Sequence, residues 1–450
     1  MNNAVRFDAA FTNTLKLIHK HLPLLAPLQE PVLLVRDVLG CFRILVDDSP
    51  AETNPDSQAA IKAFADNFSR GAGQYAPQAN NLIQWLEADS PLRDLFDLPE
   101  AWTPPDCPSH FKILDRLVTG REWSLPQLPN AAPRPPRAVF FGLKGGVGRS
   151  TALAVLAWFL SGLGKKVLVI DLDLESPGLG PILLPTSLPQ DGDTCVPGWP
   201  SFGVVDWFVE DAVGEADDSL IRDMYVRSSL ASNGDILVVP ACGGLLDQQY
   251  LSKLSRAYLD LPNQVGETEL FGDRLARLLD QLESHIGPDV VLIDSRAGLH
   301  DISSAALTRL GARNFLFAVN TRQTWEGYRH LFRHWQRNPE HLRELRKLLF
   351  SVGALRPAAD ENYLQEFCES AADVFAEIYD DDSRDGAFNF APNAEDAPHY
   401  PISIRANAEY AVFAPLEKAT QLDKDLIQFV FGEFLENATA ILFPEVDEYE

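Results

Sequence analysis

Short apolar runs alternate with longer amphipathic stretches over the C-terminal two thirds of the chain. The stretches 152–163 and 271–286 carry apolar residues at helical spacing and predict helices. The apolar runs between them suit strands that are buried on both faces of a parallel sheet, namely 138–143, 167–172, 236–239, 290–293, 315–319 and 348–352. This alternation predicts a doubly wound α/β domain with a mostly parallel sheet.

The N-terminal third has a different pattern. Helical spacing recurs over 9–25 and 59–86, while 32–46 alternates and ends in a turn signal at Asp47. We expect a small α+β domain, followed by a proline-rich stretch that favours an extended connector. The expected division is an N-terminal accessory and interaction domain (1–123), a linker (124–137) and the α/β domain (138–450).

Composition narrows the functional classes. The 450 residues include 38 basic and 64 acidic side chains, a net charge of -26 that argues against DNA as a partner. No apolar run reaches the ~18 residues that span a bilayer, so we expect a cytoplasmic protein without a membrane role. The acidic stretch 379–399 predicts a mobile surface loop. We interpret the five scattered cysteines as reduced thiols: Cys41, Cys107, Cys195, Cys242 and Cys368.

A glycine-rich segment connects the first predicted strand of the α/β domain to its first predicted helix. It reads Lys144-Gly-Gly-Val-Gly-Arg-Ser-Thr151. Glycines let backbone N–H groups converge on phosphate oxygens, and the helix N-terminus adds positive potential. The structural alternative is a tight turn that carries three glycines by chance. The strand-loop-helix context favours phosphate binding.

This segment resembles the deviant Walker A loop of the MinD/ParA branch of P-loop NTPases. The resemblance extends over about 138–435, and it implies ATP and Mg²⁺ as ligands and a dimer closed over nucleotide. Lys144 would reach the phosphates bound by the partner subunit. The residues that would cradle the phosphates are Gly145, Gly146, Val147, Gly148, Arg149, Ser150 and Thr151.

Two positions depart from the family pattern. Leu143 stands where an ordinary Walker A loop has its first glycine, a position that varies in this branch. Arg149 replaces the second lysine, so a planar fork of donors takes the place of a compact ammonium. We expect phosphate binding to persist, while rapid hydrolysis is less secure.

Polar residues near the ends of the predicted strands supply candidates for the chemistry. Ser150 would hold Mg²⁺, although its hydroxyl could instead cap the helix. Asp171 and Asp173 follow a buried strand and resemble the family's second acidic motif. The resemblance assigns Asp173 to the attacking water and Asp171 to the magnesium shell, whereas both could merely cap a turn. Asp294 ends the next apolar run, in the arrangement of a Walker B acid that binds Mg²⁺ through water.

Three further residues lie beside these motifs. Arg296 is either a cation near the phosphates and the dimer seam or one half of a surface ion pair. Asn320 either contacts nucleotide or closes a turn, and we favour the turn. His300 follows the Walker B segment, and we interpret it as structural.

The leading functional hypothesis is an ATPase switch that dimerises on ATP and regulates or assembles a partner complex. Its expected partners are ATP and ADP, a second copy of the chain, and another protein bound by the N-terminal domain. The Lys-Gly-Gly-Val-Gly-Arg motif also resembles ATPases associated with antiviral defence. Alternatives are an ATP-bound scaffold that scarcely hydrolyses and, less favoured, an ATP-dependent amide-forming synthetase.

Overall fold

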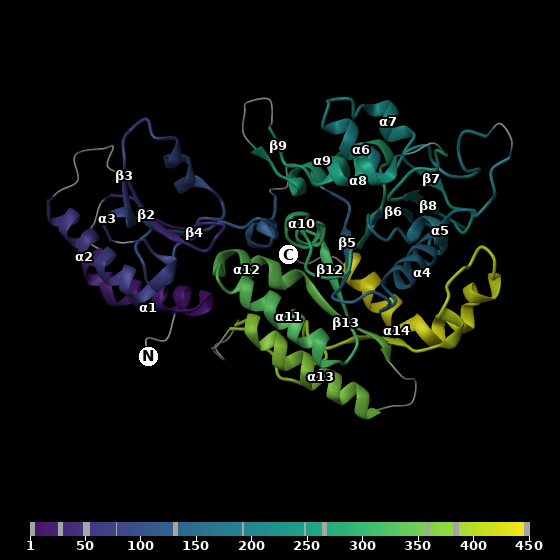
Figure 1. Cartoon of the computed structure of the whole chain (residues 1–450). Helices are drawn as coiled ribbons and strands as arrows, with labels where there is room; N and C mark the ends of the chain where they lie inside the picture. Colours follow the sequence, from purple (N-terminus) through teal and green to yellow (C-terminus); the bar gives the residue numbers. More distant parts are fainter. Residues whose placement is uncertain are drawn as a thin grey trace, which may run out of the picture. The chain divides into compact units, whose positions relative to one another are not determined.

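A computed structural model describes residues 5–25, 30–47, 55–77, 79–128, 134–190, 193–246, 249–262, 268–356, 361–380 and 387–444. The chain divides into two compact units, Met1–Leu125 and Pro126–Glu450. Figure 1 colours both units in sequence order. Within the described residues, none of the helices combines the length and apolar character needed to cross a membrane.

A four-stranded sheet forms the centre of the first unit, in the order β3-β2-β1-β4. Strand β1 pairs antiparallel with β2 and parallel with β4, and β2 pairs parallel with β3. The elements are α1 (Phe7–Leu25), β1 (Val32–Arg36), β2 (Phe42–Asp47), α2 (Pro55–Ala72), α3 (Ala79–Leu82), β3 (Ile83–Leu86) and β4 (Phe111–Asp115).

Both faces of this sheet are covered. Val32 and Leu34 point into a core shared with α1 and α2, whereas Leu33 and Val35 belong to a second cluster that contains Phe96. Successive side chains of a strand point to opposite faces, so the apolar run of β1 supplies both clusters. The N-terminal unit therefore has an α+β architecture with its own core.

The structure differs from the sequence expectations for this unit in two respects. The helix expected over 59–86 ends at Ala72, because Gly73 adopts a positive φ of 60° that a helix does not continue. Its last expected residues form β3, which pairs with β2. The run 32–46 is two strands, β1 and β2, divided by a turn in which Gly40 has a φ of 85°.

The second unit contains an eight-stranded sheet in the order β14-β13-β12-β5-β11-β6-β8-β7. Its strands are parallel except β7, which pairs antiparallel with β8 at one edge. The predicted α/β class is confirmed. The strands are β5 (Arg137–Gly142), β6 (Lys166–Leu172), β7 (Val226–Arg227), β8 (Asp235–Val239), β11 (Val290–Ser295), β12 (Arg313–Ala318), β13 (Leu349–Arg356) and β14 (Ile402–Arg405).

Helices surround this sheet, and a small hairpin of β9 (Leu261–Pro262) and β10 (Thr268–Glu269) lies beside α9 in the sequence. The helices are α4 (Arg149–Gly162), α5 (Leu179–Leu183), α6 (Val204–Asp211), α7 (Asp218–Arg222), α8 (Tyr250–Ala257), α9 (Phe271–Ile286), α10 (Asp301–Arg309), α11 (Arg322–Trp335), α12 (Pro339–Leu345), α13 (Glu361–Phe375) and α14 (Lys424–Leu442).

The main core of the second unit lies between the sheet and the helices α4 and α14, which Figure 1 shows beside each other. Phe140 of the central strand β5 packs against Phe434 of α14, with 6.2 Å between the ring centroids. Phe315 and Phe317 of β12 contact the same ring. This packing fixes the strand that leads into the glycine-rich segment.

The acidic stretch 379–399 differs from the predicted mobile loop in its described part. Residues 381–386 lie outside the described residues. Just before this gap, Asp380 forms an ion pair with Arg346 at 2.7 Å. The Tyr379 hydroxyl, also before the gap, lies 2.6 Å from Nδ1 of His399, which follows the gap. His399 is fully buried, because its ring packs among Tyr379 and Phe375. Aromatic residues anchor a stretch that its acidic composition had marked as solvated.

Part of the proline-rich stretch 124–137 also lies outside the described residues, over 129–133. Before that gap, the Leu128 N–H donates to the Arg309 carbonyl at 3.0 Å, within the second unit. After the gap, Arg137 opens β5 and forms an ion pair with Glu283 at 2.6 Å. All five cysteines are free thiols.

Candidate functional site

The glycine-rich segment forms an open loop between β5 and α4. Gly146 and Gly148 have φ values of 72° and 81°, which L side chains rarely adopt. A Cβ atom placed on Gly145, Gly146 or Gly148 would meet no heavy atom within 4 Å. The backbone of this loop therefore borders open space at the N-terminus of a 14-residue helix. A helix N-terminus beside such a loop suits an anion.

One departure from the family pattern, the leucine at position 143, has a local explanation. Leu143 packs toward α11, because a Cβ on Gly327 would lie 2.7 Å from Leu143 Cδ1. Glycine at position 327 thus makes room for leucine at position 143. Val147 is buried and fixes the loop from below, while Thr151 is half-buried in the first turn of α4.

Ser150 and Asp294 meet directly under the loop. The Ser150 hydroxyl donates to Asp294 Oδ2 at 2.5 Å. Asp294 is the penultimate residue of β11 and is only 1% exposed, and its other oxygen, Oδ1, has no hydrogen-bond partner within the described residues. A buried carboxylate oxygen without a partner is costly, and a cation or its water shell would satisfy it. The pair fits Mg²⁺, which prefers oxygen ligands and is usually held by few protein groups.

Asp171, which the family resemblance assigns to the magnesium shell, accepts backbone hydrogen bonds in this structure. It is fully buried and lies in register with Asp294 on the neighbouring strand. Its carboxylate accepts N–H groups from Asp173 at 3.1 Å and from Gly178 and Leu179 at 3.0 Å each. These bonds shape the loop 173–178 and cap α5. Burial, with repulsion from Asp294, raises the pKa of Asp171.

The guanidinium of Arg149 lies between two loops and is 6% exposed. It donates to the Ser295 carbonyl oxygen and forms an ion pair with Asp173 at 3.5 Å. Burial raises the pKa of Asp173, whereas the nearby Arg149 charge opposes that shift. The structure therefore brings two predicted residues, Arg149 and Asp173, into one contact.

Lys144 and Asn320 occupy the opposite side of the loop. Lys144 Nζ lies 3.3 Å from the hydroxyl of Thr321, the N-cap residue of α11. Asn320 Oδ1 accepts the indole N–H of Trp325 at 2.7 Å, and the Asn320 N–H donates to the Tyr363 hydroxyl at 3.0 Å. These contacts hold the segment between β12 and α11.

Arg296 pairs with Glu175, a residue that sequence reasoning missed. Tyr258 donates its hydroxyl to Glu175 Oε1 at 2.6 Å, and His300 Nε2 lies 3.8 Å from the same oxygen. His300 also caps α10 by accepting the Ile302 N–H. The one available signal for Glu175 was its place two residues after Asp173, because its partners are distant in the sequence.

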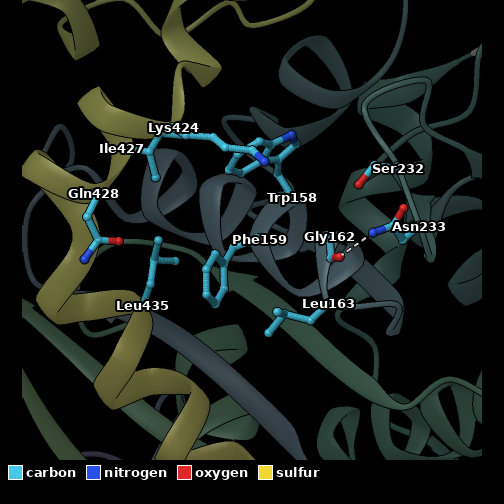
Figure 2. Close-up of a pocket in the computed structure, with 10 residues that line it drawn as sticks. All are labelled: Trp158, Phe159, Gly162, Leu163, Ser232, Asn233, Lys424, Ile427, Gln428 and Leu435. Carbon is cyan, nitrogen blue, oxygen red and sulfur yellow. Dashed lines mark hydrogen bonds between the residues drawn. The ribbon is translucent and has the colours of Figure 1, made fainter.

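A cavity of about 480 Å³ lies at the far end of α4, between that helix and α14 (Figure 2). Trp158, Phe159 and Leu163 line it from α4 and the residue after it, and Ile427 and Leu435 line it from α14. None of the predicted site residues belongs to this lining, so the cavity is separate from the glycine-rich loop.

Among the described residues, no group of three or more His, Cys, Asp or Glu side chains is placed to hold a metal ion. A magnesium ion beside Ser150 and Asp294 would therefore take further oxygens from phosphate and water. The phosphate and metal sites would therefore share the phosphate oxygens as ligands. The predicted residues that converge around the loop are Lys144, Arg149, Ser150, Asp171, Asp173 and Asp294.

Residues 137–176 match the family model described as cellulose biosynthesis protein BcsQ. Comparison with curated proteins finds no match. Similar solved structures include a ParA family ATPase from Chlorobium tepidum TLS, with 14% identity, 67% of this chain and 99% of that chain covered, and a TM-score of 0.41.

Two other similar structures are the cell division ATPase MinD of Pyrococcus furiosus and a complex of Cyanothece McdA with ATP. The MinD structure has 18% identity, covers 68% of this chain and 99% of its own, and has a TM-score of 0.38. The McdA complex has 17% identity, covers 70% and 100%, and has a TM-score of 0.40. Identities this low carry no ligand or partner over to this chain.

Proposed function

We propose that the second unit is an ATP-binding and ATP-hydrolysing switch of the deviant Walker A type. The observation that carries the proposal is the Ser150–Asp294 pair beneath an open glycine loop at the start of α4. A hydroxyl, an unpartnered carboxylate oxygen and the backbone N–H groups of an open glycine loop are the groups that a magnesium-bound triphosphate requires. The match of 137–176 to a family model includes this loop and the following acidic strand.

Each residue has a defined task in this proposal. The backbone of 145–151 binds phosphate, and Ser150 with Asp294 orients the metal through its hydroxyl and through water. Bound Mg²⁺ would neutralise charge on the phosphate oxygens. Asp173 accepts a hydrogen bond from the attacking water, and Asp171 holds the loop that carries Asp173.

The proposed switch closes as a dimer. Lys144 stands at the rim of the loop, and its Nζ lies 3.3 Å from the Thr321 hydroxyl. A long, half-buried cation so loosely held is free to turn toward phosphates bound by a second copy. We propose that the N-terminal unit then presents the closed state to a protein partner in the cytoplasm. The motif resemblance suggests antiviral defence as the setting.

The second candidate function is an ATP-bound scaffold with very slow hydrolysis. The observation that favours it is the engagement of Arg149 by the Ser295 carbonyl and by Asp173. In that state the ion pair with Arg149 engages the Asp173 carboxylate, which a hydrolysing enzyme needs to orient the attacking water. A scaffold would bind ATP and assemble, yet would not depend on Asp173 for turnover.

Light scattering tests the switch. The mass of the purified protein is measured with Mg-ATP, with Mg-ADP and without nucleotide, alongside Lys144→Ala and Asp173→Ala. The proposal expects doubling with ATP alone, no doubling for Lys144→Ala and a prolonged dimer for Asp173→Ala. A mass that ignores nucleotide contradicts the switch. ATP-dependent assembly with turnover unchanged by Asp173→Ala supports the scaffold.

A further inference from the structure

The carboxylate of Glu175 gathers groups from separate parts of the second unit. Its Oε1 accepts the Tyr258 hydroxyl at 2.6 Å, pairs with Arg296, and lies 3.8 Å from His300 Nε2. Its Oε2 is buried and has no hydrogen-bond partner within the described residues. Glu175 belongs neither to the proposed phosphate loop nor to the proposed metal pair, Ser150 and Asp294.

These partners connect three segments. Glu175 belongs to the loop 173–178 after β6, Arg296 and His300 belong to the loop after β11, and Tyr258 directly follows α8. The first residue of α8, Tyr250, donates to the Leu174 carbonyl oxygen. Both ends of α8 therefore hold the same loop, one through backbone and one through the Glu175 side chain.

The network favours the protonated form of Tyr258. The Glu175 side chain is 24% exposed, so its bonds are largely shielded from water. Burial, together with the Glu175 hydrogen bond and charge, raises the pKa of Tyr258. Tyr258 therefore keeps its proton and remains a hydrogen-bond donor to Glu175 Oε1.

Asp173 lies two residues before Glu175 in the same loop and senses the same charges. Glu175 raises the pKa of Asp173 and Arg296 lowers it, in addition to the stronger effects of burial and Arg149. Two residues of extended chain span only ~7 Å, so a displacement of Glu175 is transmitted to Asp173. We therefore expect the orientation of the Asp173 carboxylate to respond to where Glu175 is held.

We propose that Glu175 is a positioning residue for ATP hydrolysis, joining the loop 173–178 to Arg296 and Tyr258 so that Asp173 faces the attacking water. The inference rests on the proposed ATPase function and adds to it a residue outside the Walker motifs. It predicts a loss in kcat with little change in nucleotide affinity, because the phosphate loop and the Ser150–Asp294 pair are not part of the network.

The test compares Glu175→Gln, Glu175→Ala and Tyr258→Phe with a matched control, Glu269→Gln. Glu269 forms an ion pair with Arg277 at 2.8 Å, and its side chain is also 24% exposed. Displacement by about 1 Å costs up to ~100-fold in rate. We expect kcat to fall at least about tenfold in Glu175→Ala, with KM and the affinity for a fluorescent ATP analogue within about twofold of wild type.

The conservative variants separate positioning from general destabilisation. Glu175→Gln keeps an oxygen that accepts the Tyr258 hydroxyl but loses the charge that pairs with Arg296, so its kcat should lie between wild type and Glu175→Ala. Tyr258→Phe should slow wild type but add little to Glu175→Ala. Equal kcat in wild-type, Glu175→Ala and Glu269→Gln proteins overturns the inference.

Hydrogen exchange of the nucleotide-free protein gives a second readout. Amides of 173–179 should exchange faster in Glu175→Ala than in Glu269→Gln, while amides of α4 should not change. Unchanged exchange over 173–179 overturns the anchoring by Glu175, whatever the activity. If wild type shows neither ATP binding nor hydrolysis, the proposed function fails, and the exchange result still decides whether Glu175 holds the loop.

Discussion

The two glycines at the ends of α4 offer a stringent test of the phosphate loop. Gly148 precedes the helix with a φ of 81°, and Gly164 follows it with a φ of 84°. A Cβ on either glycine meets no heavy atom within 4 Å. Alanine therefore meets the same backbone strain at both positions and no collision at either. Only the methyl group at position 148 would project into the space assigned to phosphate.

The magnitude follows from the left-handed backbone. An L residue in this conformation costs roughly 1–2 kcal/mol, and alanine regains about 0.4–1 kcal/mol by restricting the unfolded chain. Each substitution should therefore lower the stability of the nucleotide-free protein by about 1 kcal/mol. ATP at 100 times its dissociation constant should stabilise wild type and Gly164→Ala by about 2.7 kcal/mol, and Gly148→Ala hardly at all.

Thermal unfolding with and without Mg-ATP measures both effects. A stability change of 1 kcal/mol moves the Tm by about 2–4 °C in a domain of 150–250 residues, and by less in a larger unit. Equal Tm losses without nucleotide, and a nucleotide-induced rise missing only from Gly148→Ala, would support the loop as the phosphate site. The assignment fails if Gly148→Ala gains the same rise as Gly164→Ala.

Two further predictions concern the charged groups below the loop. Burial raises the pKa values of Asp171 and Asp294. Between the unfolded pKa of about 3.9 and these raised values, the folded state therefore binds more protons than the unfolded state. The stability of the nucleotide-free protein consequently falls as the pH rises through the raised pKa values. Urea unfolding between pH 4 and 8 should show this slope, and Asp294→Asn should flatten it; an unchanged slope would refute the assignment to Asp294. Arg149→Lys should destabilise the nucleotide-free protein by about 1–3 kcal/mol, because a lysine cannot keep both the Ser295 and Asp173 contacts, and chemical denaturation would measure the loss.

The strands of the parallel sheet could be predicted because burial on both faces leaves an uninterrupted apolar signature. Every run assigned to a strand in the second unit became one, including β11, expected over 290–293 and observed over Val290–Ser295. Strands not predicted from the sequence are β3, β4, β7, β9, β10 and β14. Strand β7 has two residues at a sheet edge, and β3 continues a helical pattern beyond Gly73. Their strand character comes from pairing, which local periodicity does not record.

The candidate site also contains some features that the sequence predicts and others that it does not. The glycine loop and the acids near the C-terminal ends of β6 and β11 are contiguous motifs, and the parallel sheet brings these strand ends to one edge. The partners of Glu175 come from loops about 80 and 120 residues away in the sequence. Their meeting depends on the packing of α8, so a single sequence offers no pattern for it.

The two candidate functions differ in what Arg149 does when phosphate arrives. Without nucleotide, its guanidinium is shared between the Ser295 carbonyl and Asp173. A guanidinium has five N–H donors in a fixed plane, so it cannot keep both contacts and also turn fully to a phosphate. For a hydrolysing switch, phosphate must win Arg149 from Asp173, which frees the carboxylate for water. For a scaffold, Asp173 stays paired. Turnover that rises in Arg149→Lys would therefore identify the Arg149–Asp173 ion pair as the restraint on hydrolysis.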